Sequence, residues 1–254
     1  MLRGMISALW VAPLITAARP VRGFAASAKT GGRALTLLYP AIPHPRFDAS
    51  YYRDHHEKLF MDIYGSAIER FELRTVSAPR TRGFIAMINV WIADFAAFNA
   101  RSTNAAYDRM DRDKKNFTNI QSSVELDEVL SAVGEARSAP RVGDTCISLL
   151  YRNHAGASWD SEAYCRTYLP MLMDSLGTAA VERIEVRRGL QQLDGGDPSY
   201  LGGTNIYVRD RAAFARAWAR HGQTLDSRSA RLSNVEPLRM QTTVYGIESK
   251  PLRS

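Results

Sequence analysis

Three side chains in one short segment, Tyr51, Tyr52 and His56, have the residue types needed for acid/base chemistry. Tyr52 and His56 are four residues apart, so in a helix they lie on the same face. A half-buried imidazole titrates near neutral pH and can act as a general acid or base. We therefore predict that His56 and Tyr52 are catalytic, with Tyr52 or Tyr51 orienting a phenol or carbonyl substrate. The alternative is that His56 fills space and hydrogen-bonds only a backbone group.

Further aromatic and histidine side chains are candidate contacts for a substrate. The helical face that we expect to look toward a sheet contains four residues at helical spacing, Tyr52, His56, Leu59 and Ile63. His55 points about 100° around the helix from His56, so it faces solvent or forms a secondary part of the cavity. Trp91 is a strand aromatic that either contacts the substrate or packs in the core. The predicted substrate-binding residues are Tyr39, Tyr51, Trp91 and His55.

Local signals indicate the elements that must position these residues. Apolar strands are expected over residues 34–42, 68–76, 84–92 and 124–133, and helices follow the N-cap residues Asp48 and Asp94. Phe47 and Tyr52 can form a hydrophobic staple that fixes the entry angle of the first helix. Gly65 is placed to end that helix. The predicted order is therefore strand, helix, strand, strand, helix, strand.

The second expected strand alternates between apolar and charged residues. Phe71 and Leu73 alternate with Glu72 and Arg74, which predicts one buried face and one face in water. A βαββαβ module covers only one face of its sheet with helices, so the other apolar face must pack on another element.

The second half of the chain follows the first at an offset of 112 residues that grows slightly along the chain. An internal match of this kind predicts that one module occurs twice. Tyr168 falls on the position of His56, so we predict one competent site and one degenerate site. Matched segments are Leu37–Tyr39 with Leu149–Tyr151, Glu69–Arg74 with Glu182–Arg187, Asn89–Asp94 with Asn205–Asp210, and Thr118–Ile120 with Ser233–Val235.

The two predicted sheets are natural partners for each other. We expect them to pack face to face within one chain, as in a homodimer of single modules. The predicted organisation is a leader over residues 1–33, a first module over 34–134, a linker over 135–143 and a second module over 144–250.

The segment Phe47-Asp48-x-x-Tyr51-Tyr52-x-x-x-His56, which follows a strand ending in Tyr39-Pro40, resembles the signature of the EthD family of dimeric α+β barrel proteins. That signature continues with proline and leucine, and here Lys58 replaces the proline while Leu59 keeps the leucine. The second half resembles it less, because Tyr168 replaces the histidine and Ala163 replaces the first tyrosine.

This resemblance extends over residues 34–248. It implies an α+β fold in which two ferredoxin-like βαββαβ modules pack sheet to sheet as an intramolecular dimeric α+β barrel. The chain would then be a tandem duplication with a degenerate second copy and a small cavity between helices and sheet. The resemblance does not select a reaction, because the wider superfamily includes cofactor-free oxygenases, isomerases, fungal polyketide decarboxylases and haem enzymes.

The charge distribution points to a targeting leader. Residues 1–47 contain no Asp or Glu, and part of the net charge of +7 lies in this region. The apolar stretch over residues 5–18 is interrupted by Pro13 and is shorter than the roughly 20 residues that span a bilayer. We predict a mitochondrial transit peptide and no membrane span. A secreted or periplasmic location and a disordered basic tail are the alternatives.

Several classes of site lack their sequence signals. Arg82-Gly83-Phe84 begins like an RNA-recognition motif, but Ile85 and Ala86 stand where that motif needs a small residue and then an aromatic one, so no nucleic-acid partner is expected. The two cysteines, Cys146 and Cys165, have no metal-binding spacing. No phosphate-binding glycine loop or other cofactor motif is present in the sequence.

Two functions remain open at this point. In the first, His56 acts on a small apolar or aromatic molecule in a cavity of the first module, as in a cofactor-independent lyase, isomerase or oxygenase. In the second, the chain is a non-catalytic subunit of a mitochondrial complex, with other protein subunits as partners.

Overall fold

The computed structural model describes residues 31–76, 83–134 and 140–249. Most of the predicted leader and linker therefore lies outside the described residues, although Arg33, placed in the leader, begins the first strand. The first half contains β1 (Arg33–Pro40), α1 (Ala49–Tyr51), a π-helical turn (Tyr52–His56), α2 (Glu57–Tyr64), a 3-10 turn (Gly65–Ala67), β2 (Ile68–Val76), β3 (Phe84–Ile92), α3 (Phe95–Arg101), α4 (Asn104–Phe117) and β4 (Ser123–Gly134).

The second half has a closely similar order of elements. It contains β5 (Thr145–Arg152), α5 (Ser161–Ala163), a π-helical turn (Tyr164–Tyr168), α6 (Leu169–Leu176), β6 (Val181–Gln192), β7 (Tyr200–Val208), α7 (Arg211–Ser229) and β8 (Leu238–Ser249). Each half is the predicted ferredoxin-like βαββαβ module.

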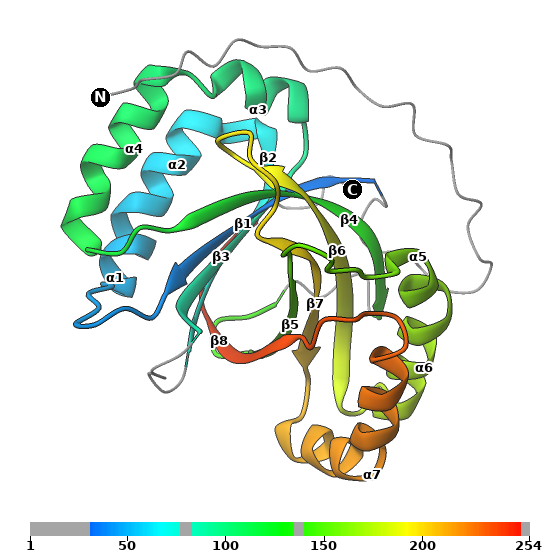
Figure 1. Cartoon of the computed structure of the whole chain (residues 1–254). Coiled ribbons are helices and arrows are strands. Elements are labelled where there is room, and N and C mark those ends of the chain that lie inside the picture. The colour runs from blue at the N-terminus through cyan, green and yellow to red at the C-terminus, as the bar shows by residue number, and fades with distance from the viewer. Residues whose placement is uncertain (1–30, 77–82, 135–139, 250–254) are drawn as a thin grey trace.

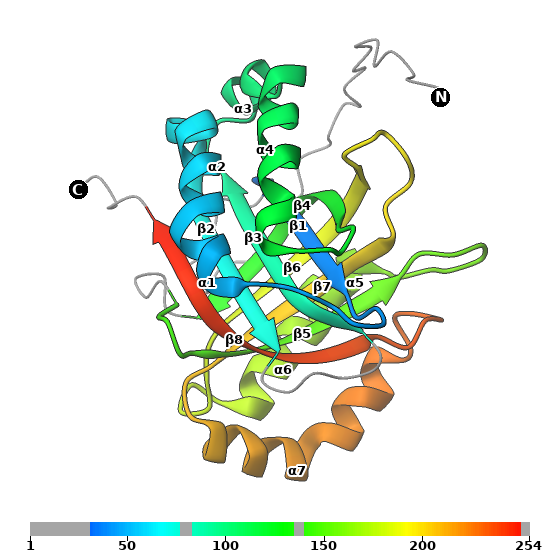
Figure 2. The ribbon, with the colours of Figure 1, turned by 90° about the vertical axis from the view of Figure 1, so that its left-hand side faces the viewer.

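The eight strands form one closed antiparallel barrel in the order β1-β3-β2-β8-β5-β7-β6-β4. β2 pairs with β8 along one seam between the halves, and β4 pairs with β6 along the other. The helices of each half cover the outer surface of its own sheet (Figures 1 and 2). This architecture confirms the predicted intramolecular dimeric α+β barrel and adds that the sheet edges are hydrogen-bonded, which removes exposed edges.

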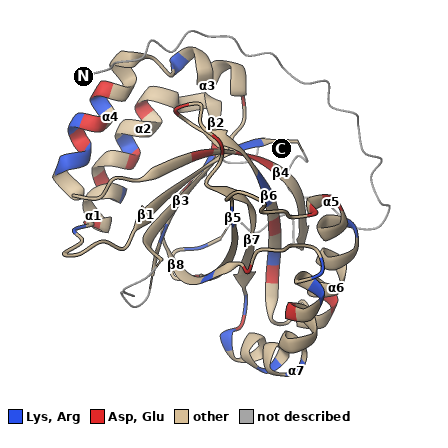
Figure 3. Ribbon diagram, viewed as in Figure 1, with Lys and Arg blue, Asp and Glu red and all other residues tan. Residues whose placement is uncertain are grey.

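The prediction of a water-facing side on the second strand is wrong. Glu72 and Arg74 are both 0% exposed, because that face of β2 lines the interior of the barrel. Charged residues also lie along β4 and β6 (Figure 3). The apolar residues of the other face, such as Phe71 and Leu73, pack beneath the helices of the first half.

The helix starts follow the predicted capping signals. The side chains of Asp48 and Asp94 accept hydrogen bonds from the backbone N–H groups of Tyr51 and Ala97. The ring of Phe47 stacks on that of Tyr52 with a centroid separation of 5.6 Å, as expected for the staple. These contacts fix the entry of the chain into the helix that carries His56.

The second helix of the first half is broken, although one continuous helix was expected. α3 ends at Arg101, and α4 restarts after Thr103, whose hydroxyl accepts the N–H of Ala106. The corresponding helix of the second half, α7, is unbroken over Arg211–Ser229. Over the described part of the chain, no helix is long and apolar enough to cross a membrane.

Candidate functional site

The helix that carries His56 contains a π-helical turn. The N–H of Glu57 bonds to the carbonyl oxygen of Tyr52, five residues earlier. This wider turn rotates the following residues, so Phe60 and Tyr64 are buried after His56, whereas Leu59 and Ile63 are only partly buried. The predicted inward face is therefore correct for Tyr52 and His56 and wrong beyond them.

His56 forms a hydrogen-bonded pair with Asp113 of α4. The distance from His56 Nδ1 to Asp113 Oδ2 is 2.8 Å, and His56 is 5% exposed. An ionised carboxylate can only accept hydrogen bonds. Nδ1 of His56 therefore carries a proton and donates a hydrogen bond to Asp113. The remaining ring nitrogen, Nε2, is then the unprotonated one in the neutral imidazole.

The surroundings favour the neutral form of this histidine. Burial lowers the pKa of His56, and the hydrogen bond and charge of Asp113 oppose this without cancelling it. Burial also acts to raise the pKa of Asp113, but hydrogen bonds from His56, Tyr51 and Asn116 outweigh it and hold that pKa below its usual value. At neutral pH the pair is a carboxylate beside a neutral imidazole.

Asp113 is itself held by two further groups. Its Oδ1 accepts a hydrogen bond of 2.8 Å from the hydroxyl of Tyr51 and one of 2.9 Å from the amide of Asn116. The Asn116 amide also donates to the Tyr51 hydroxyl at 3.0 Å. Tyr51 therefore orients the carboxylate, and the exposed His55 lies over the Tyr51 ring at 4.7 Å, outside the buried pair.

The predicted residues Tyr52 and Tyr39 form an aromatic wall beside His56. The ring of Tyr52 lies 4.9 Å from that of His56, and Phe117 lies 4.6 Å from His56 on another side. Burial raises the pKa of both tyrosines, and their hydroxyls share a hydrogen bond, with Ser122 also bonded to Tyr39. Both tyrosines stay protonated, so their role at this site is to pack and to donate hydrogen bonds.

Trp91 lies away from this group of residues. It faces the barrel interior, where its Nε1 donates to both carboxylate oxygens of Glu185 at 3.0 and 3.1 Å. The guanidinium of Arg70 lies 3.4 Å from the centre of its ring. The sheet therefore separates Trp91 from His56, and of the predicted site residues Trp91 alone is on the opposite face.

The second half has the same aromatic arrangement without an imidazole. Tyr168 is buried at the position of His56, and its ring lies 4.6 Å from that of Tyr164. In the alignment of the two halves, Arg228 falls on the position of Asp113, and it is exposed. The second half thus has neither partner of the His–Asp pair at these positions.

Sequence reasoning missed Asp113 and Asn116. The helical segments near the site contain four carboxylates, and their spacing does not show which one is the partner of His56. These are Asp54, which is partly buried, Asp108, Asp111 and Asp113. The choice depends on the direction of α4 after the break at Thr103. The N-cap residue types Ser102, Thr103 and Asn104 are a local signal for this break, but they do not give the direction of the helix that follows. Within the described ranges, no group of three or more His, Cys, Asp or Glu side chains could hold a metal ion.

Comparisons with known proteins bear on the fold. No protein-family model and no curated protein sequence matches the chain. An anthrone oxidase-like protein is 11% identical with a TM-score of 0.53, and the match covers 89% of this chain and 96% of that one. A protein from Fusobacterium nucleatum subsp. nucleatum assigned as a monooxygenase is 9% identical with a TM-score of 0.56, and the match covers 86% of this chain and 94% of that one.

An EthD-like protein from Ralstonia eutropha JMP134 is 22% identical with a TM-score of 0.36, over 45% of this chain and 98% of that one. At these identities, the two whole-chain likenesses show that the chain has the fold of these proteins, and a shared fold does not define a reaction.

Proposed function

We propose that the chain is a small-molecule enzyme in which His56 is the general acid/base and Asp113 holds it in position. The observation that carries this proposal is the 2.8 Å hydrogen bond between His56 Nδ1 and Asp113 Oδ2 in a buried aromatic setting. A carboxylate that fixes the tautomer and orientation of an imidazole is a recurring device for making its other nitrogen a base. The substrate class that suits the aromatic surroundings is a small apolar or aromatic molecule.

The lowered pKa of His56 supports a base rather than an acid in the resting protein. A neutral imidazole at neutral pH can take a proton through Nε2, and Asp113 then stabilises the resulting imidazolium. Because His56 is only 5% exposed, a substrate reaches it through movement of the surrounding helices or rings. The class of reaction that fits is proton abstraction followed by cofactor-independent isomerisation, elimination or oxygenation.

We also propose that the two halves arose by tandem duplication of an EthD-like module. The support is their nearly identical element order and the matching registers of β1 with β3 and of β5 with β7. In this view the second half has kept the packing role of the motif, with Tyr168, and has lost its acid/base group.

Anthrone is the first substrate to test, because one protein of the same fold is anthrone oxidase-like by name. In this reaction Nε2 of His56 takes a proton from the methylene carbon, and the carbanion gives electrons to O₂. One anthrone and one O₂ then yield one anthraquinone and one water, so no other oxidant is needed. Oxygen uptake and the absorbance of anthraquinone report the rate.

The variants His56→Ala and His56→Gln should lower this rate by about 10²–10⁴-fold, as loss of a general base does. His56→Gln keeps most of the buried volume and a polar group near Asp113, so its melting temperature should stay closer to that of the wild type than that of His56→Ala. His221→Ala, which changes an exposed histidine on α7, is the matched control and should keep the wild-type rate. If anthrone is not turned over, a panel of phenols and activated ketones followed by NMR extends the test. Full turnover by His56→Gln on any substrate found would refute the assignment.

A second candidate function is a non-catalytic subunit of a mitochondrial complex. The observation in its favour is that α7 exposes four arginines, Arg211, Arg216, Arg220 and Arg228, which an acidic partner protein could contact. Size-exclusion chromatography of a native mitochondrial extract tests it, because a subunit elutes far above the mass of the single chain. N-terminal sequencing of the mature protein tests the proposed transit peptide, since a start at Met1 contradicts it.

A further inference from the structure

One end of the barrel opens into a cleft of about 710 Å³. Strands of both halves begin or end there, and the lining includes Phe84 at the start of β3, Arg152 at the end of β5 and Tyr200 at the start of β7. None of the residues that surround His56 is among the described residues that line it. A volume of this size can hold a small molecule, and the mouth of a β-barrel is a common place for such a site.

Two aromatic rings meet at this mouth. Phe84 and Tyr200 occupy matching positions of the two halves, and their rings contact edge to face with a centroid separation of 6.1 Å. Across the sheet, Tyr200 is paired with Arg152 in the same way that Phe84 is paired with Pro40. The second half therefore places a hydroxyl and a guanidinium where the first half has a phenyl ring and a proline.

The guanidinium of Arg152 donates a hydrogen bond to the hydroxyl of Tyr200. Burial raises the pKa of Tyr200, and the charge and hydrogen bond of Arg152 oppose this without cancelling it, so the hydroxyl stays protonated. Because arginine has only donors, the Tyr200 oxygen accepts in this contact, and its own proton remains available to another acceptor. Arg152 is exposed and forms no ion pair with a carboxylate of the described residues. Two neighbouring donors, one of them a cation, can thus bind one anionic group.

Hydrogen bonds fix the wall beside these donors. The loop between β6 and β7 is tied to the end of β5 by Asn153, whose amide donates to the carbonyl oxygen of Pro198 at 2.8 Å. The backbone N–H of Ser199, in the same loop, donates to Glu125 of β4 at 3.1 Å. The cleft is therefore pre-formed, which lowers the entropic cost of binding a ligand.

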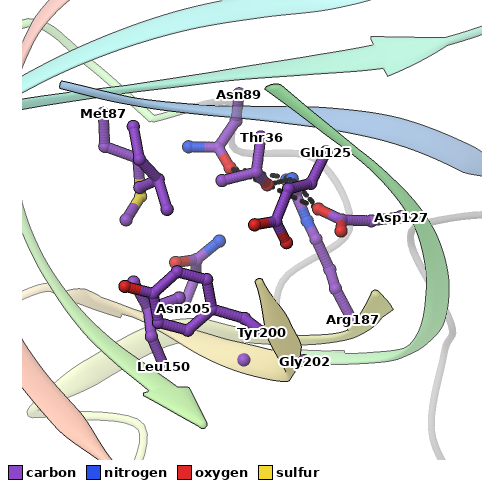
Figure 4. A pocket seen from close by; sticks show the side chains of 12 residues that line it. Thr36, Met87, Asn89, Glu125, Asp127, Leu150, Arg187, Tyr200, Gly202 and Asn205 are labelled. Atoms are coloured by element: carbon purple, nitrogen blue, oxygen red, sulfur yellow. Dashed lines mark hydrogen bonds and ion pairs between the residues drawn. The ribbon is translucent and has the colours of Figure 1, made fainter. Parts of the chain in front are cut away.

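Tyr200 lies between the cleft and the barrel interior. It also lines an inner pocket of about 20 Å³, together with Glu125 and Arg187 (Figure 4). That pocket has room for one water-sized group. A larger ligand therefore stays in the outer cleft.

Two carboxylates near Tyr200 act against an anion. Asp197 lines the cleft but is exposed, so water and salt screen its charge. Burial raises the pKa of Glu125 to about 7, so this group is only partly ionised at neutral pH. Arg152 is the one Lys or Arg among the described residues that line the cleft, and its guanidinium is always charged. A single cation suits a monoanion, and the two carboxylates disfavour a dianion such as phosphate.

We propose that this cleft binds a small apolar carboxylate. Its oxygens accept hydrogen bonds from the guanidinium of Arg152 and the hydroxyl of Tyr200, and its carbon skeleton lies against the ring of Phe84. Charge-assisted hydrogen bonds from arginine are among the strongest contacts that a carboxylate makes. The site does not include His56, so it does not depend on the catalytic role proposed for that residue.

The test is a titration of the full chain with benzoate at pH 7, followed by isothermal calorimetry. Saturable binding is expected in the wild type and in His56→Gln. Arg152→Gln should weaken it about tenfold or more through loss of a charge-assisted bond, and Tyr200→Phe about threefold or more through loss of the hydroxyl. Phenylalanine already occupies the matching position of the first half, as Phe84, so Tyr200→Phe should fold.

Two further variants separate a specific contact from general attraction to a basic protein. Arg216→Gln is the matched control, because Arg216 is exposed on α7 and does not line the cleft, and it should keep the wild-type affinity. Asp197→Asn removes a negative charge from the cleft and should tighten binding about twofold. Weaker binding by Asp197→Asn would contradict an anionic ligand.

Benzamide has the shape of benzoate without the charge, and acetate has the charge without the ring, so both should bind more weakly than benzoate. The proposal is overturned if benzoate does not bind saturably, if benzamide binds as tightly, or if Arg152→Gln retains wild-type affinity. Loss of binding in His56→Gln with retention in Arg152→Gln would place benzoate at the His56 site and would also overturn it. Melting curves identify any variant that fails to fold, and Arg152→Gln, which changes an exposed side chain, should melt as the wild type does.

Discussion

Replacement of Glu185 by Gln should strongly destabilise the barrel. Glu185 is 0% exposed and accepts hydrogen bonds from Trp91, from Arg183 at 2.8 Å and from Arg187 at 2.7 Å, while Arg70 lies 3.8 Å away. Gln keeps the shape of the side chain but removes the negative charge that three buried guanidinium groups share. Breaking a buried ion pair in this way costs about 3–5 kcal/mol.

The lowered pKa of the Glu185 carboxyl leads to a similar free-energy cost. Burial by itself raises the pKa of Glu185, but the charges of Arg187, Arg183 and Arg70 outweigh it and hold the pKa at about 2, compared with 4.5 for an unperturbed Glu. A difference of this size corresponds to about 3 kcal/mol. Because the folded-state pKa is lowered, this stability is present above pH 4.5 and is lost as the pH falls from about 4.5 toward 2.

Urea denaturation followed by circular dichroism measures the effect. At pH 7 the free energy of unfolding of Glu185→Gln should be about 3 kcal/mol below that of the wild type, and the difference should shrink at pH 3. Glu182→Gln, a change on the same strand at a partly exposed position, should cost less than about 0.5 kcal/mol. A loss below about 1 kcal/mol for Glu185→Gln would refute the view that this carboxylate holds the arginines together.

Three other perturbations follow from individual contacts. Asp113→Asn should lower the pKa of His56 further, because Asp113 acts to raise it; an NMR titration that shows a higher pKa contradicts this. Glu57→Gln should make the protein more stable than wild type by roughly 1–3 kcal/mol at pH 9. The reason is that burial raises the pKa of Glu57 to about 8, so the stability of the wild type falls as the pH rises from about 4.5 to about 8. If urea denaturation at pH 9 shows Glu57→Gln to be less stable than the wild type, this prediction is wrong. Thr103→Ala removes the N-cap of α4 and should cost about 1 kcal/mol in urea denaturation, and an unchanged midpoint would count against the cap.

Local signals in the sequence were sufficient to predict most of the fold. Asp48 and Asp94 are found as N-caps, and the Phe47–Tyr52 staple is present. The match between the two halves correctly indicated two modules packed through their sheets. These features depend on neighbouring residues and on a repeated pattern, so a single sequence contains them.

The error on the second strand has a clear physical cause. Alternation of Phe71 and Leu73 with Glu72 and Arg74 shows that the two faces of the strand differ, but it does not show that the polar face meets water. Here that face meets the polar face of the other half, and buried charges pair with one another. The same ambiguity placed Trp91 among the substrate contacts, although it lies in the barrel interior.

The candidate site could be predicted only in part. His56 and Tyr52 are adjacent and buried as expected, and Tyr51 reaches the site through its hydroxyl. The π-helical turn and the break before α4 are not visible in the hydrophobic pattern, and together they decide which residues surround His56. Asp113 is therefore a partner that only the three-dimensional arrangement identifies.

The protonation state of the two ring nitrogens of His56 is the most direct test of its proposed role as the base. In protein labelled with ¹⁵N-histidine, we expect a neutral imidazole at pH 7 with the proton on Nδ1, directed at Asp113, and an unprotonated Nε2. The ¹⁵N chemical shifts distinguish the two tautomers, and His56→Gln identifies the signal. A proton on Nε2, or an imidazolium at pH 7, would contradict the assignment of His56 as the base.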